Sequence, residues 1–141
     1  MKLRVTEALG PAERATVRDA LSAYNRAAIG DMAGPGTPLA VFVEDAEGAV
    51  LGGAVAELRM GWLFLDLLHL PAELRGQGFG TGLLDALEAE ARARGLLGVH
   101  LNTASFQAPG FYERHGYTRI GTLQDLPPGH ALHWYAKRFP A

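Results

Sequence analysis

Three glycines at alternate positions, Gly76, Gly78 and Gly80, have the spacing best suited to a chemical task. Glycine lacks a Cβ, so the backbone can bend tightly there and bring its N–H groups close to a ligand. A helical pattern begins directly after these glycines, and the first turn of a helix carries unpaired N–H donors and a partial positive charge. With Arg75 beside them, the glycines predict a binding site for a phosphate group.

The spacing of this turn excludes two common phosphate-binding motifs. A P-loop requires Gly-x-x-x-x-Gly-Lys-Ser/Thr, and the segment has no lysine. The dinucleotide fingerprint Gly-x-Gly-x-x-Gly also fails, because its third glycine would fall on Thr81 or on Leu83. A glycine-rich helix entry that binds no ligand stays open as the alternative.

The glycine turn lies between a predicted strand and a predicted helix. Trp62–Leu70 is an apolar run and is expected to be a strand with both faces largely buried. Gly78–Arg94 is expected to be a helix, because its leucines form one apolar stripe and Gly95 follows as a natural stop. The strand–helix–strand passage from Trp62 to Leu101 implies a right-handed crossover between parallel neighbours.

The rest of the chain adds more strands and two further helices. Runs of adjacent strands imply antiparallel pairing, so a mixed α/β sheet is predicted. The helices are expected over Pro11–Gly30 and Pro109–His115. The strands are expected at Leu3–Thr6, Leu39–Val43, Ala49–Leu58, Leu97–Leu101, Tyr117–Leu123 and Ala131–Phe139.

Composition limits the classes of protein to which the chain can belong. Hydrophobic residues make up 48% and charged residues 20%, which favours a folded chain over a disordered one. The formal net charge of −2 indicates no nucleic-acid partner. Cysteine is absent, which excludes disulfides, thiolate zinc sites and a cysteine nucleophile. His100 and His115 show no metal-ligand pattern with carboxylates, so no metal site is expected.

No segment resembles a targeting signal or a membrane span. Met1–Val5 lacks the apolar run of a signal peptide. The longest apolar stretch is far shorter than the roughly 20 residues needed to cross a bilayer. A cytoplasmic protein is therefore expected, with residues 1–141 as a single domain and no membrane partner.

Two separated motifs resemble the GNAT superfamily of N-acetyltransferases. Its hallmark, Arg/Gln-x-x-Gly-x-Gly/Ala after a strand, is matched by Arg75, Gly78 and Gly80. Phe111–Tyr117 resembles the second signature, an aromatic–tyrosine pair followed by Gly-Tyr or Gly-Phe. The strand and helix order fits as well, so the resemblance spans essentially the whole chain. Ser105–Ala108 and Pro127–His130 are similar to segments of a bacterial subgroup.

The resemblance implies a fold and a cosubstrate. The fold would be a six- to seven-stranded, mostly antiparallel sheet with helices on both faces and a splayed central pair of parallel strands. Acetyl-CoA would give its acetyl group directly to a primary amine in a ternary complex, and a non-catalytic acyl-CoA sensor is the alternative. The residues implied in cofactor binding are Leu68, His69, Leu70, Arg75, Gly76, Gln77, Gly78, Phe79, Gly80, Thr81 and Ser105.

Two side chains are candidates for acid and base catalysis. Tyr112 matches the family's general acid, since a tyrosine stays protonated at pH 7; packing in a short helix is the alternative. Asp66 is the candidate base, because a carboxylate within an apolar strand either lines a cleft or is costly to bury. Strand alternation would place it on one face with Leu68 and Leu70. A hydrogen-bonded structural aspartate is the competing interpretation.

The acceptor amine is not specified by any pattern, and a small molecule or a peptide would both fit. Glu57 and Arg59 are interpreted as solvated charges on a strand, and contact with the substrate is the alternative interpretation. The oligomeric state is left open by the sequence, and an exposed last strand, Ala131–Phe139, would be able to pair with a second copy as a homodimer.

Overall fold

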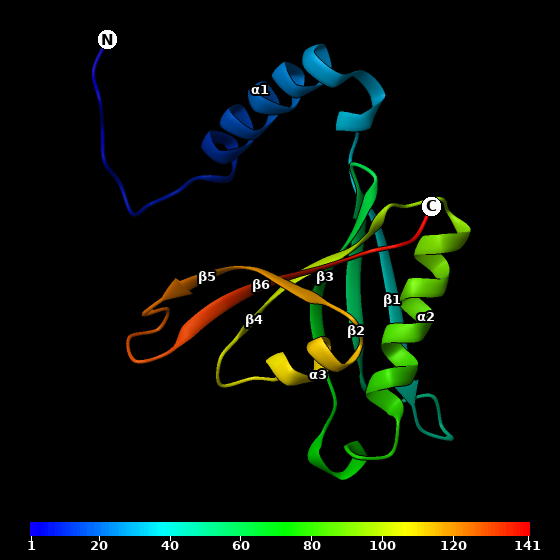
Figure 1. The fold of residues 1–141 in the computed structure, drawn as a ribbon. Helices are drawn as coiled ribbons and strands as arrows, with labels where there is room; N and C mark the ends of the chain where they lie inside the picture. Colours follow the sequence, from blue (N-terminus) through cyan, green and yellow to red (C-terminus); the bar gives the residue numbers. More distant parts are fainter. The chain divides into compact units, whose positions relative to one another are not determined.

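A six-stranded sheet forms the centre of the fold in the computed structural model, which describes all 141 residues (Figure 1). Its strand order is β1-β2-β3-β4-β6-β5, and every neighbouring pair except β3 and β4 is antiparallel. The predicted mixed, mostly antiparallel α/β sheet is therefore confirmed. The strands are β1 Thr37–Glu44, β2 Val50–Arg59, β3 Trp62–His69, β4 Gly98–Ala104, β5 Thr118–Gln124 and β6 Ala131–Arg138.

The sheet lies within one of two compact units, Gly36–Ala141, and Met1–Pro35 forms the other. The amino-terminal unit contains α1, Pro11–Ile29, followed by a short 3-10 helix over Gly30–Ala33. Residues 3–6 form no strand, so the predicted opening strand is wrong. A strand needs a partner for its N–H and C=O groups, and this segment pairs with no strand of the sheet.

The parallel pair β3–β4 is joined over a short distance only. Its paired residues run from Leu63 opposite Val99 to Leu65 opposite Leu101. Beyond this point β3 continues to His69 without β4 as its partner. The two strands therefore separate toward their carboxyl ends, as expected for a splayed central pair, and leave a gap in the ladder where side chains and backbone groups can meet a ligand.

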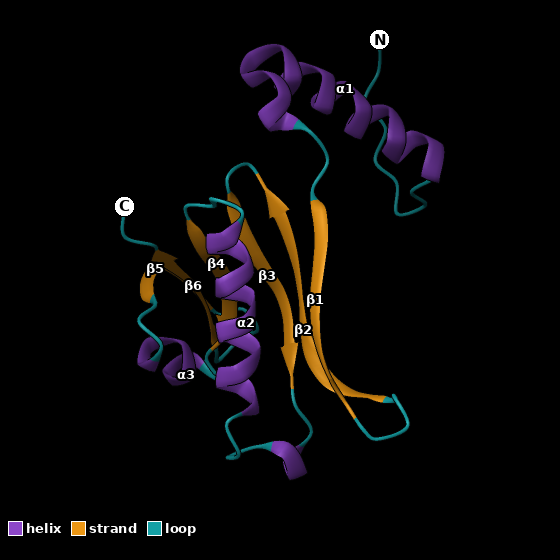
Figure 2. Ribbon diagram, turned by 90° about the vertical axis from the view of Figure 1, so that its right-hand side faces the viewer, coloured by secondary structure: helices purple, strands orange, loops and turns teal.

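Helix α2, Phe79–Ala93, makes the crossover from β3 to β4 and packs on β1, β2 and β4 (Figure 2). Its leucine stripe is fully inside: Leu84 and Leu87 have no exposed surface, and Leu83 has 3%. Each such leucine contributes about 1.5–3 kcal/mol through removal from water. The apolar stripe thus fixes the glycine turn at the start of α2.

No helix of the structure is both long and apolar enough to cross a membrane.

Helix α3, Pro109–Arg114, follows β4 and adds Tyr112 to the same apolar core as the α2 leucines. The chain then forms β5 and returns as β6, which pairs with β4 on one side and β5 on the other. The expectation of an exposed last strand is therefore wrong, because β6 is interior and the open edges are β1 and β5. A homodimer stays a prediction without that argument.

Candidate active site

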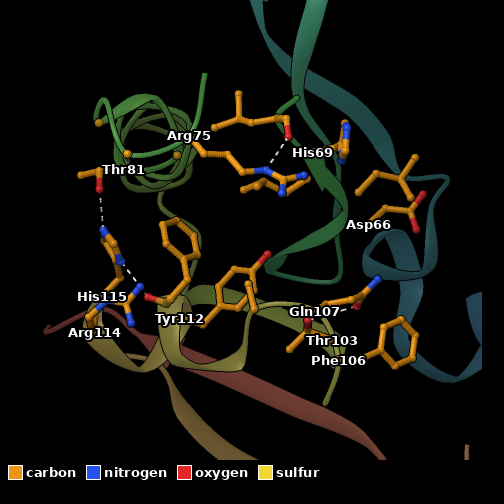
Figure 3. A pocket seen from close by; sticks show the side chains of 18 residues that line it. Asp66, His69, Arg75, Thr81, Thr103, Phe106, Gln107, Tyr112, Arg114 and His115 are labelled. Atoms are coloured by element: carbon orange, nitrogen blue, oxygen red, sulfur yellow. Dashed lines mark hydrogen bonds between the residues drawn. The ribbon is translucent and has the colours of Figure 1, made fainter. Parts of the chain in front are cut away.

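A cavity of about 950 Å³ opens where β3 and β4 separate (Figure 3). Four segments line it: the end of β3, the glycine turn, the loop after β4, and α3. The sequence-predicted residues that line it are Asp66, Leu68, His69, Leu70, Arg75, Gly76, Gly78, Gly80, Thr81 and Tyr112. Residues from distant parts of the sequence therefore meet around one space.

The glycines of the turn have two different reasons to be glycine. Gly76 and Gly78 have positive φ angles of 73° and 86°, which side chains rarely adopt. A Cβ at either position would meet no atom within 4 Å, so both open into free space. At Gly80 a Cβ would lie 3.3 Å from Cε2 of Phe111. The first two glycines leave room for a ligand, whereas Gly80 allows α2 and α3 to pack closely.

Backbone donors and one guanidinium surround this open space. The first hydrogen bond of α2 joins the Gly82 N–H to the Gly78 carbonyl at 2.9 Å, so the preceding N–H groups have no intrahelical partner. Arg75 Nε donates to the carbonyl of Leu70 at 3.0 Å, which fastens the turn to the end of β3. Such a ring of donors suits a diphosphate.

Three predicted cofactor residues do not line the cavity. Gln77 turns away and donates from Nε2 to the Glu73 carbonyl at 2.6 Å, and Phe79 is an exposed first helical residue. The Ser105 hydroxyl accepts a hydrogen bond from the Ala131 N–H at 3.0 Å. Ser105 therefore ties the end of β4 to the start of β6, and its side chain is used for structure.

Gln107 occupies the cavity wall near Ser105, and sequence reasoning gave it no role. Its Oε1 accepts from the Ala104 N–H at 2.8 Å and from the Thr103 hydroxyl at 3.2 Å. Because both partners are donors, the amide oxygen is fixed and the NH₂ group is left free. Gln107 thus adds a hydrogen-bond donor to the cavity wall (Figure 3). Its sequence signals were its place shortly after a strand and within the Ser105–Ala108 segment, and neither gave it a role.

Tyr112 is buried, with 7% of its surface exposed, and its hydroxyl points into the cavity (Figure 3). Its ring packs against those of Phe111, Tyr117 and Tyr135, with centroids 5.1, 5.8 and 6.3 Å away. The hydroxyls of Tyr117 and Tyr135 are used within the protein, in bonds to Glu88 and Glu113 at 3.1 and 2.8 Å. Of the three packed tyrosines, only Tyr112 keeps its hydroxyl free.

Burial also sets the protonation of this tyrosine. Removal from water disfavours the phenolate and raises the pKa of Tyr112 to about 12. The side chain is therefore a neutral acid throughout the physiological range, with a free O–H directed at the cavity. The side chain can therefore donate a hydrogen bond to a group in the cavity, although its raised pKa makes it a weaker acid than an ordinary tyrosine.

A buried network of charged side chains contacts the packed tyrosines Tyr112, Tyr117 and Tyr135 through Tyr117. Glu88, with 3% of its surface exposed, accepts from Tyr117 and from Lys137 Nζ at 2.8 Å. Lys137 also donates to the carbonyl of His115 at 2.9 Å. Burial, followed by the Glu88 charge, raises the pKa of Tyr117 far above its ordinary value. The network joins α2, the end of α3 and β6, which together position Tyr112.

Asp66 sits at an irregularity in β3. Val55 of β2 pairs with Leu67 and Ala56 with Leu65, so Asp66 has no partner on β2. A bulge of this kind re-aims a side chain and is common beside active sites. Asp66 is exposed on the wall of the main cavity, and it also lines a second hollow of about 550 Å³ together with Glu57. The carboxylate thus lines a cleft, one of the two outcomes considered from the sequence.

Two expectations about β3 are corrected by the same bulge. The strand was expected to be buried on both faces, but Asp66, Leu67 and His69 are exposed. Alternation was expected to place Asp66 with Leu68 and Leu70; the two leucines pack on the core, Asp66 is exposed, and all three line the cavity. The register shift resets the period-2 pattern, so counting residues along the strand fails there.

His115 and Arg114 complete the wall on the α3 side. The His115 ring lies between two helices, with Nε2 2.9 Å from the Thr81 hydroxyl and Nδ1 2.8 Å from the Phe111 carbonyl. Sequence reasoning considered this histidine only as a metal ligand, and the contact with α2 could not be read from spacing. No group of three or more His, Cys, Asp or Glu side chains is arranged to hold a metal ion.

Sequence comparison places these features in a known family. The acetyltransferase (GNAT) domain family matches residues 38–119, from β1 into β5. Acetyltransferase Atu2258 of Agrobacterium fabrum is 40% identical over 128 residues, which is 91% of each chain. Blasticidin-S acetyltransferase of Streptomyces morookaense is 40% identical over 104 residues, 71% of this chain and 76% of that protein.

Solved structures agree with the sequence matches. An acetyltransferase of Bacillus cereus ATCC 14579 superimposes with a TM-score of 0.87 at 30% identity, over 96% of this chain and 98% of that one. A protein of Agrobacterium tumefaciens gives a TM-score of 0.90 at 35% identity, over 99% and 100% of the two chains. The chain belongs to the GNAT family of acetyltransferases and is an acetyl-CoA-dependent member.

Proposed function

We propose that the cavity binds acetyl-CoA and that the acetyl group passes directly to a primary amine in a ternary complex. The observation that carries this proposal is the position of Tyr112: a buried, neutral tyrosine with a free hydroxyl faces the same cavity as an open glycine turn. The glycine turn suits the phosphates of the donor, and the tyrosine suits the chemistry at its thioester. The phosphate end and the thioester end of acetyl-CoA would thus each have a suitable group in the cavity.

The residues present fit the cosubstrate. Backbone N–H groups from Gly76 to Thr81 would hold the pyrophosphate, with Arg75 and Arg114 supplying positive charge at the wall. The backbone at the end of β3, from Leu68 to Leu70, would hold the pantetheine arm in the gap that β4 leaves. The glycine turn therefore offers donors to the phosphates, and the end of β3, to which Arg75 is bonded, offers extended backbone to the arm.

The reaction requires three proton and charge tasks. Asp66 would take a proton from the attacking ammonium, whose ordinary pKa of about 10.4 leaves it protonated at pH 7. The amine nitrogen then bonds to the acetyl carbon, the C–S bond breaks, and the nitrogen loses its second proton, which restores Tyr112 after that side chain has donated to the sulfur. The free Gln107 NH₂, or a backbone N–H near His69, would donate to the oxyanion. Tyr112 would donate its hydrogen to the leaving sulfur.

The raised pKa of Tyr112 limits how it can act on the leaving sulfur. Its pKa of about 12 exceeds the roughly 8.5 of an ordinary thiol by about 3.5 units, or about 5 kcal/mol. Complete proton transfer to a free thiolate would therefore be uphill. Tyr112 acts mainly as a strong hydrogen-bond donor to the sulfur as charge develops there, and the proton follows as CoA leaves.

The acceptor is proposed to be a small primary amine that carries further positive charge. Its route would be the second hollow, where Glu57 and Asp66 both present carboxylates and no basic side chain lines the wall. The Glu57 side chain lies where a Cβ on Gly36 would otherwise be, so a glycine makes room for it. The relative named for blasticidin S supports placing such compounds first among acceptors to be tried.

A thiol-release assay tests the proposal. The chain has no cysteine, so every thiol that appears comes from CoA. The protein is incubated with acetyl-CoA and a panel that includes blasticidin S, diamines, aminoglycosides and peptide amino termini. Acceptor-dependent thiol release with an equal amount of acetylated amine is the expected result. Thermal stabilisation by acetyl-CoA without release on any acceptor would contradict the catalytic proposal, and absence of binding would contradict the cofactor site.

A further inference from the structure

His115 forms a bridge between the two helices that border the phosphate end of the cavity. Its Nδ1 is 2.8 Å from the Phe111 carbonyl within α3, and its Nε2 is 2.9 Å from the Thr81 hydroxyl in the first turn of α2. The Phe111 ring stacks on it at an inclined angle, with centroids 4.5 Å apart. Both ring nitrogens are therefore engaged, and the ring is held in place (Figure 3).

The partners determine where the protons lie. A carbonyl oxygen only accepts, so Nδ1 must carry a hydrogen and donate to Phe111. In the neutral ring, Nε2 is then an acceptor, and Thr81 must donate its single hydroxyl hydrogen to it. The Thr81 hydroxyl in this state has lone pairs but no hydrogen to offer to a ligand.

A phosphate oxygen only accepts hydrogen bonds, so this state of Thr81 is wrong for the proposed cosubstrate. Protonation of the ring reverses the bridge, because Nε2–H then donates to the Thr81 oxygen and the hydroxyl hydrogen becomes free. The same protonation adds a positive charge that is separated from the proposed phosphate position by the Thr81 hydroxyl. Two gains for an anionic ligand thus depend on one proton.

We propose that His115 is a proton-linked phosphate-binding residue, so that CoA binding at this turn is coupled to proton uptake by the ring. The inference rests on the proposed function, in that it assumes the glycine turn binds the CoA pyrophosphate. Affinity is highest below the pH range in which a histidine loses its charge. It falls by up to about tenfold per pH unit through that range, which lies between pH 5 and 8 for an ordinary histidine.

The charged groups nearest His115 come from β6 and α3. Lys137 of β6 donates to its carbonyl, and Arg114 of α3 and Arg75 of the turn line the same cavity. Asp85, one turn further along α2, makes no hydrogen bond to the ring. An arriving pyrophosphate would be an anion beside this ring and would favour its protonated form.

The Lys137 charge itself is held by the buried Glu88 carboxylate at 2.8 Å, and Glu113 is used by Tyr135 and Arg119. No carboxylate side chain therefore contacts the His115 ring. The bound pyrophosphate would then be the anion that favours the protonated His115 ring over the neutral one.

Calorimetric titration with dephospho-CoA tests this coupling. The probe keeps the pyrophosphate but lacks the titrating 3′-phosphate. Any proton taken up on binding near neutral pH is therefore bound by the protein and not by the ligand. Dissociation constants are measured from pH 5.5 to 8.5, and proton uptake is obtained at one pH from buffers of different ionisation enthalpy. Weaker binding as pH rises, with up to one proton taken up, is the expected result.

Two variants and a control assign the proton to His115. His115→Asn keeps a donor toward Phe111 but cannot titrate, so the pH slope and the proton uptake should disappear. Thr81→Val removes the hydroxyl and should weaken binding at low pH while making the slope shallower. His100→Asn, at a histidine packed against Trp62 and Phe64 outside this cavity, should bind like the unaltered protein.

Each outcome has a distinct meaning. Binding that is independent of pH, or a slope that persists in His115→Asn, overturns the proton linkage while leaving the cofactor site intact. Failure of both acetyl-CoA and dephospho-CoA to bind at any pH overturns the proposed function instead. Should His115→Asn unfold, as judged by circular dichroism, a Thr81→Val variant with undiminished slope and affinity would by itself contradict the inference.

Discussion

Tyr112 is buried, and its hydroxyl bonds to no protein group. The catalytic role of this one oxygen atom can therefore be tested by substitution. Tyr112→Phe removes that oxygen and leaves the ring, so the packing with Tyr117 and Tyr135 should persist. We expect turnover to fall by roughly 10²- to 10⁴-fold, with the acetyl-CoA dissociation constant unchanged. Steady-state kinetics and calorimetry measure the two quantities. Tyr24→Phe, in the amino-terminal unit, is the matched control, and an unchanged rate in Tyr112→Phe would remove it from the mechanism.

Asp66 gives a second prediction at the residue scale, in the pH dependence of the rate. Without a base, Asp66→Asn can use only the fraction of acceptor that is already neutral. The rate should therefore fall at pH 7 and rise about tenfold per pH unit until the amine pKa of roughly 10.4. Glu57→Gln should instead raise KM for charged acceptors with little change in kcat. A pH–rate profile with the same shape in Asp66→Asn and the unaltered enzyme would argue against the base.

Among the elements, the start of α2 separates ligand binding from helix stability. Gly78 has φ 86° and opens into the cavity, whereas Gly82 lies inside the helix and does not line the cavity. Gly78→Ala should weaken CoA binding at least tenfold and strain the turn by about 1–2 kcal/mol. Gly82→Ala should stabilise the protein by about 0.5–1 kcal/mol with binding retained. Calorimetry and urea unfolding measure both, and equal effects on binding would contradict the assignment.

The network behind α3 makes a prediction about folding stability. Tyr117→Phe removes the buried hydrogen bond to Glu88, so the free energy of unfolding should fall by about 1.5–3 kcal/mol in urea titrations. Because burial raises the pKa of Tyr112 and of Tyr117, their neutral forms stabilise the native state fully below the unfolded tyrosine pKa of about 10. That contribution is lost as pH rises above 10, and the loss should be smaller in Tyr117→Phe. A stability that is flat up to pH 11 would be inconsistent with this account.

Much of the element order was predictable, because it depends on local patterns. The leucine stripe of α2 and the glycines before it indicated the helix and its start; the phosphate site at these glycines stays a prediction. The bulge at Asp66 could not be predicted, because register is set by pairing with β2 and not by the residues of β3 alone. His115 and Gln107 were missed for a similar reason: their partners, Thr81 and Ala104, are brought to them only by the fold.

For the whole molecule, ligand binding and folding should be linked. A ligand that binds only the native state at 100 times its dissociation constant stabilises it by about 2.7 kcal/mol. For a chain of this size we expect acetyl-CoA to raise Tm by about 5–10 °C. Differential scanning fluorimetry measures the shift, which Gly78→Ala should greatly reduce. A Tm that does not respond to saturating acetyl-CoA would contradict a cofactor site built from native turns.

The place of β6 between β4 and β5 has a consequence for biosynthesis. Both neighbours precede it in the chain, so a growing polypeptide exposes two strand edges until residues 131–138 have emerged. The same strand carries Tyr135 and Lys137, which hold α3 through Glu113 and the His115 carbonyl. Folding of the catalytic side must therefore wait for translation of β6. A nascent chain stalled before Ala131 would be a good substrate for chaperones, and not yet an enzyme.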